Sequence, residues 1–137
     1  MSFFRIFDTA GSAMSAQSVR LNTTASNLAN ADSVSTTPEG AYRAREPVFA
    51  TIQQGLGKER EGAGVRVTGI SESAQPIGSR FEPGNPLANA DGYVFTPNVN
   101  PVDELVNMIS ASRAYQNDVE VMNSAKQLML KTLDLGK

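Results

Sequence analysis

The stretch that decides the fold is residues 102–135, which read VDELVNMISASRAYQNDVEVMNSAKQLMLKTLDL. Taken in alternating steps of three and four, these residues place apolar side chains along one helix face for about four heptads. The stripe is Leu105, Met108, Tyr115, Val119, Met122, Met129 and Leu133, broken by Ser112 and Lys126. The pattern predicts a single helix of about 50 Å, at about 1.5 Å per residue.

Both ends of this helix carry signals of their own. Asn100 is a suitable N-cap, and Pro101 fits the first helical position because its missing N–H is not needed there. Two acidic residues follow in the first turn, where negative charge is favourable. Gly136 supplies a stop at the far end. The C-terminal helical region is therefore predicted to occupy residues 101–137.

The beginning of the chain repeats the same pattern. Apolar residues again recur in steps of three and four, with Gln17 and Thr24 as the breaks. This stripe is Phe3, Phe7, Ala10, Met14, Leu21 and Leu28. Serine, threonine, proline and glycine residues crowd the segment from Ser33 to Gly40 and favour turns. A second helical region is thus predicted over residues 1–31.

The residues between the helices, 32–100, are rich in turns and contain short apolar alternations. Extended or β segments are predicted at 41–50, 65–70 and 93–95, the first of them an edge strand because it contains Pro47. Gln53 to Gly64 is polar and rich in glycine, and predicts a mobile loop. The fold class is therefore mainly α, with long N- and C-terminal helices forming a coiled-coil-like core and a small β- and turn-rich middle insert.

The length of the C-terminal helix indicates assembly. A compact chain of 137 residues would measure roughly 35 to 40 Å across, which is less than the helix itself. Pairing the two stripes with each other would still leave a second, adjacent stripe on the C-terminal helix without a neighbour, and such apolar surfaces usually mark interfaces. That stripe is Ala111, Ala114, Val121, Ala125, Leu128 and Leu135. We therefore predict lateral packing between subunits, with an assembly interface of Phe3, Phe7, Met14, Leu21, Leu28, Leu105, Met108, Tyr115, Val119, Met122, Met129 and Leu133.

Composition argues against several functions. The chain has no His and no Cys, which removes thiolate and imidazole chemistry, so no catalytic, cofactor-binding or metal-binding residue is expected. A net charge of −2 with scattered basic residues argues against a nucleic-acid partner. No run is long and apolar enough to predict a membrane span. Residues 1–17 lack the basic and apolar regions of a cleaved secretory signal.

The hexamer Ala25-Ser26-Asn27-Leu28-Ala29-Asn30 is the most distinctive motif of the chain. Leu28 belongs to the stripe, and the amides of Asn27 and Asn30 flank it. These amides could hydrogen-bond neighbouring backbone and fix the register, as buried asparagine does in coiled coils. Alternatively, they are simply tolerated where a helix ends. Periodicity leaves both interpretations open.

Residues 26–30 of this hexamer resemble the signature of bacterial flagellar rod and hook proteins. Further segments are similar to the proximal rod members of that family, namely residues 12–17, 42–45, 91–94, 97–100 and 108–116. The resemblance implies a non-enzymatic structural subunit of the basal-body rod, which transmits torque across the periplasm. It also implies export without a cleaved signal through the flagellar type III apparatus. Implied partners are copies of the chain, other rod proteins and the base-proximal rod adaptor. A soluble coiled-coil adaptor or secretion chaperone is the alternative, because it would use the same stripes.

Overall fold

The computed structural model describes residues 3–54 and 61–136. Its elements, in chain order, are α1 (Phe3–Ala29), β1 (Arg45–Gln54), β2 (Glu61–Glu72), β3 (Gly78–Phe81), β4 (Tyr93–Thr96) and α2 (Pro101–Leu135). Both predicted helices are confirmed, and the β segments lie between them. The molecule is mainly α with a small β-containing insert.

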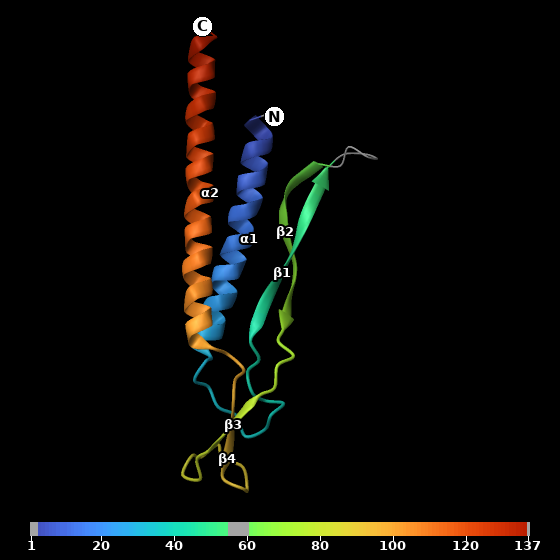
Figure 1. The fold of residues 1–137 in the computed structure, drawn as a ribbon, viewed down its shortest axis with the longest axis vertical. Coiled ribbons are helices and arrows are strands. Elements are labelled where there is room, and N and C mark those ends of the chain that lie inside the picture. Colours follow the sequence, from blue (N-terminus) through green and yellow to red (C-terminus); the bar gives the residue numbers. More distant parts are fainter. Residues whose placement is uncertain (1–2, 55–60, 137) are drawn as a thin grey trace.

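The elements form an elongated body in which α1 lies in the middle (Figure 1). The antiparallel α2 packs along one side of α1, and the β1–β2 hairpin packs along another. The short β3–β4 pair lies beyond the end of α1, together with the connecting loops. At the opposite end, the last turns of α2 extend past the beginning of α1.

The start of α2 follows the predicted capping pattern. Asn100 has an extended backbone, and its side-chain oxygen accepts a hydrogen bond of 3.0 Å from the backbone N–H of Val102. Pro101 occupies the first helical position. Gly136 ends the helix with a φ of −89°, so its role as the stop does not use the left-handed conformation that glycine often adopts there.

The hairpin is longer than the sequence patterns indicated. Gln53 pairs with Gly62 and Gln54 with Glu61, so the ladder runs into both ends of the segment predicted as a loop. The loop prediction is wrong at those ends because backbone hydrogen bonds continue through polar and glycine residues without any apolar alternation. Its centre, residues 55–60, lies outside the described residues. Pro47 does lie in an edge strand, since this sheet has only two strands.

A second small sheet closes the lower end of the molecule. β3, which no sequence pattern predicted, pairs with β4, and Ser35 forms an isolated bridge with Phe95. That bridge ties the segment after α1 to the segment before α2. Gly92 has a φ of +79°, and a Cβ there would lie 2.8 Å from the ring of Phe81, so this turn requires glycine.

The core contains few large side chains. All but one of the buried apolar residues in the described ranges are alanines, and the exception is Val94, which is fully buried. The alanines are Ala10, Ala16, Ala41, Ala44, Ala111 and Ala125. Many large apolar side chains are instead exposed, so the isolated chain buries little of its hydrophobic surface.

Candidate assembly surfaces

Small side chains lie at the centre of the contact between α1 and α2. Ala10 on α1 and Ala111 and Ala125 on α2 are buried. Alanine lets two helix backbones approach closely, and it contributes little apolar area. Across this seam the guanidinium of Arg20 donates a hydrogen bond of 3.1 Å to the side-chain oxygen of Asn107. The seam is thus close but stabilised weakly by burial.

The face of α2 that meets α1 includes residues of the second stripe, which the predicted pairing of the two helices through their first stripes did not include. The buried residues Ala111 and Ala125 belong to the second stripe, as does Val121, which lines a hollow shared with α1. Most residues of the first stripe of α2, among them Met108, Tyr115 and Met122, are half-buried as well, so the seam lies between the two stripes and not on the first alone. The physical reason is side-chain size, because the methionine, tyrosine and leucine side chains of the first stripe are too large for the centre of a close seam.

The predicted interface residues are consequently only partly covered within one chain. Leu105 and Leu133 are 50% and 61% exposed. The side chain of Phe3 lies outside the described residues, although its backbone begins α1. The remaining members are half-buried, namely Phe7, Met14, Leu21, Leu28, Met108, Tyr115, Val119, Met122 and Met129. Both helices keep apolar area available for other subunits.

The sequence patterns did not indicate a further exposed apolar face at the start of α2. Next to Leu105, the first two turns of α2 present three further large side chains to solvent, Val102, Val106 and Ile109. Their spacing of three and four residues is a helical signal that could have identified this face. Together with Leu105 they form a continuous apolar face on α2.

The side chain of Asn27 forms a junction between α1 and the start of β1. It is 1% exposed, its oxygen accepts a hydrogen bond of 2.9 Å from the N–H of Arg45, and its nitrogen donates one of 2.9 Å to the C=O of Arg45. The hydroxyl of Tyr42 donates a third, also of 2.9 Å, to the same oxygen. Asn27 therefore holds the backbone of Arg45 as a neighbouring strand would.

Asn98 holds the same backbone from the segment before α2. Its oxygen accepts a hydrogen bond of 2.7 Å from the N–H of Ala44, the residue next to Arg45. Its nitrogen donates one of 2.8 Å to the C=O of Gln75, beyond the end of β2. Asn27 and Asn98 together connect both helices to the entry and exit of the hairpin. We call this group of hydrogen bonds the asparagine junction.

The two interpretations of the hexamer motif are each correct for one residue. Asn27 fixes neighbouring backbone, although it does so within one chain. Asn30 donates its side-chain hydrogen bond to the C=O of Ser26, four residues earlier, which is a local contact at the end of α1. Ala29 is exposed and Leu28 half-buried, so the motif combines a junction, a helix end and an apolar contact residue.

Comparisons with known proteins identify the family. A model of the flagella basal body rod protein matches residues 7–35, and a model of the flagellar basal body rod FlgEFG protein C-terminal region matches residues 90–135. Over the full length of both proteins, the chain is 56% identical to the flagellar basal-body rod protein FlgC of Yersinia enterocolitica and 54% identical to that of Salmonella typhimurium. The chain belongs to the FlgC family of flagellar basal-body rod proteins. It is a structural subunit of the rod.

The chain is also similar to the flagellar basal-body rod protein FlgC of Bacillus subtilis, with 34% identity over the full length of both chains. The two family models match segments that contain most of α1 and α2, and the hairpin lies between them. FlgC relatives are rod proteins, which favours the rod over the soluble adaptor or chaperone. Over the described ranges, neither helix combines the length and apolar character that a membrane span requires.

Proposed function

We propose that this chain polymerises through its terminal helices to form part of the shaft of the flagellar rod. Residues 1–31 and 101–137 would form the axial core, and residues 32–100 the outer insert that contacts adjoining subunits. The observation that carries this proposal is the placement of apolar residues. Alanines close the seam within one chain, whereas large side chains on both helices remain exposed or half-buried. Burial of these side chains between subunits would supply the stabilisation that the single chain lacks.

Torque transmission follows from packing and from the asparagine junction. Close-packed side chains resist sliding, so subunits that share helical seams would turn together. The side-chain oxygens of Asn98 and Asn27 accept hydrogen bonds from the N–H groups of the consecutive residues Ala44 and Arg45, which limits rotation of the hairpin about α1. A subunit built in this way passes force between its helices and its insert with little internal bending.

We infer the location, the export route and the partners of this chain from its family. The names of the relatives support a place in the basal body, and the resemblance supports the periplasmic rod as its position. We infer export through the flagellar type III apparatus without a cleaved signal, and no enzymatic activity. The partners are further copies of the chain, other rod proteins and the base-proximal rod adaptor.

Electron microscopy of basal bodies would test polymerisation through the helices. In a strain that lacks the native chain, Met122→Asp is expected to give basal bodies without a complete rod and cells that do not swim. Met122 lies half-buried on the first stripe of α2, and a carboxylate there would be desolvated in a subunit interface. Gln116→Asp, at an exposed polar position of the same helix, is the matched control and should leave the rod intact. Complete rods with Met122→Asp would refute the proposal.

A further inference from the structure

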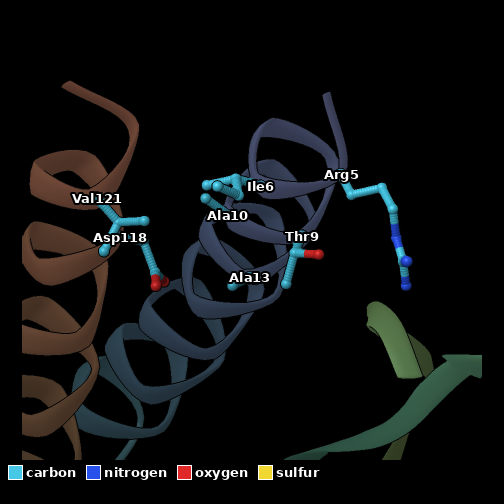
Figure 2. A pocket seen from close by; sticks show the side chains of 7 residues that line it. All are labelled: Arg5, Ile6, Thr9, Ala10, Ala13, Asp118 and Val121. Atoms are coloured by element: carbon cyan, nitrogen blue, oxygen red, sulfur yellow. The ribbon is translucent and has the colours of Figure 1, made fainter. Parts of the chain in front are cut away.

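An open hollow of about 290 Å³ lies between α1 and α2, near the start of α1. Ile6, Ala10 and Ala13 of α1 and Val121 of α2 give it an apolar lining (Figure 2). The carboxylate of Asp118 is directed from α2 toward α1 across this lining. Thr9 and Arg5 complete the lining, and the side chain of Arg5 is directed away from Asp118 (Figure 2). The hollow thus combines apolar walls with one acidic group that faces α1.

Asp118 has no ionic or hydrogen-bonded partner within residues 3–54 and 61–136. Its side chain is half-buried beside Ala10 and Val121. A carboxylate in such surroundings loses part of its hydration and gains from an opposite charge placed close to it. The hollow is therefore suited to a basic side chain carried on an apolar surface.

The end of α2 presents such a surface. Leu128, Lys131 and Leu135 are spaced by three and four residues, so they share one helix face. All three are exposed, Leu128 to 56% and Leu135 to 89%. The last turns of α2 extend past the beginning of α1 (Figure 1), so α1 of the same chain does not cover them. Leu128 lies at the border of this part, because it shares a hollow with Ile6 of α1. We call this face the α2 overhang.

We propose that the α2 overhang of one copy docks in the hollow of a second copy, with the ammonium group of Lys131 facing the carboxylate of Asp118. Leu128 and Leu135 would then lie against the apolar lining. The inference rests on the proposed function, because it requires subunits that assemble through their terminal helices. It goes further by naming the two surfaces that meet and the charges that set their register.

The contact has a defined geometry. Asp118 and Lys131 are 13 residues apart on one helix, or about 20 Å at about 1.5 Å per residue, so they cannot pair within a chain. Two parallel copies shifted by about this distance would bring Lys131 of one beside Asp118 of the other. The contact joins the α2 overhang of one copy to the hollow of the other. Each pair of copies therefore keeps one free hollow and one free overhang, so the contact can repeat along a shaft.

A charge exchange tests the pairing in a strain that lacks the native chain. Asp118→Lys and Lys131→Asp are each expected to abolish swimming, because each places like charges together. The double variant Asp118→Lys/Lys131→Asp should restore swimming, and the restored pair can only form between copies. The control combines Asp118→Lys with Lys126→Asp, which changes a lysine on another face of α2, and should not swim. Normal swimming of either single variant, or no rescue by the double variant, would overturn the inference.

Disulfide cross-linking tests directly which molecule occupies the hollow beside Asp118. The chain contains no Cys, so Asp118→Cys/Lys131→Cys introduces the only thiols and should give disulfide-linked copies in isolated basal bodies. Asp118→Cys/Lys126→Cys should give none. A photo-reactive residue at position 118 that links a different rod protein instead of a second copy would overturn the assignment. If these tests fail while Met122→Asp still prevents rod formation, the docking contact is wrong and the proposed function stands.

Discussion

The side chain of Asn27 hydrogen-bonds both main-chain groups of Arg45, accepting from its N–H and donating to its C=O, each at 2.9 Å. A helix has no free backbone groups on its side, so α1 could not pair with a strand directly. The amide of Asn27 carries one acceptor and two donors and replaces the missing strand partner. This pairing sets where the hairpin leaves α1.

We expect Asn27→Ala to destabilise the subunit by on the order of 3 kcal/mol, because it removes the partner of the N–H and C=O of Arg45 and leaves the hydroxyl of Tyr42 with Ser26 alone. The matched control is Asn30→Ala, which removes one local bond at the end of α1 and should cost under about 1 kcal/mol. The temperature at which the chain is released from isolated basal bodies would measure both effects. Equal release temperatures for the two variants would contradict a special role for Asn27.

The sequence was sufficient to predict the helices and the approximate positions of β1, β2 and β4, but not β3. The cap at Asn100, Pro101 and a long apolar stripe act locally, so they located α2 without reference to any other element. The four residues of β3, Gly78–Phe81, are all exposed and show no inside–outside alternation. Their pairing with β4 depends on a partner far along the chain, and a local pattern cannot show that.

Two features of the assembly surfaces could be identified only from the structure. Periodicity showed that α2 carries two apolar stripes, but it did not show which of them meets α1. The structure shows that both contribute. Ala111 and Ala125 of the second stripe are buried at the seam, where only small side chains fit, and most residues of the first stripe are half-buried. The motif also suggested that Asn27 fixes neighbouring backbone, whereas the identity of that backbone, Arg45, follows only from the folded arrangement.

Ala111→Leu should separate α1 from α2. Ala111 is fully buried, and three added carbon atoms in a close seam should cost about 1 to 3 kcal/mol through displaced neighbours. Ala114→Leu is the matched control, because Ala114 lies on the same helix and is only half-buried. Release temperatures of the two variants from basal bodies would compare them. Our assignment of the seam requires the larger decrease for Ala111→Leu.

The carboxylate of Glu82 should titrate below the ordinary range of a glutamate. Hydrogen bonds from Asn85, at 2.9 Å, and from Arg80 lower its pKa. Because the pKa is lower in the folded state, this interaction stabilises the fold above the unfolded pKa and is lost as the pH falls through the folded one. Asn85→Ala should raise the pKa of Glu82 in a carboxyl NMR titration. An unchanged pKa would exclude Asn85 as its main cause.

Leu28→Asp should prevent assembly without affecting export. Leu28 is half-buried in one chain, and we predict that a neighbouring subunit covers the rest of it. A carboxylate at this position would be desolvated in the interface without a partner. Immunoblots should detect the variant outside the cytoplasm, while swimming and rod formation are lost. Ala29→Asp, at the exposed neighbouring position, is the control. Normal swimming with Leu28→Asp would refute its place in the subunit interface.

The free chain should be less ordered than the assembled one. Its seam buries mainly alanine, while Leu105, Leu133 and Leu135 remain exposed, so little apolar burial offsets the entropy lost in ordering two long helices. Circular dichroism of the dilute monomer should therefore show less helix than the structure contains. Hydrogen exchange should be fast in the terminal helices of the monomer and slow in isolated basal bodies, where other subunits would cover these side chains. Protected helices in the dilute monomer would mean that the alanine seam alone suffices, and assembly would then join subunits that are already rigid.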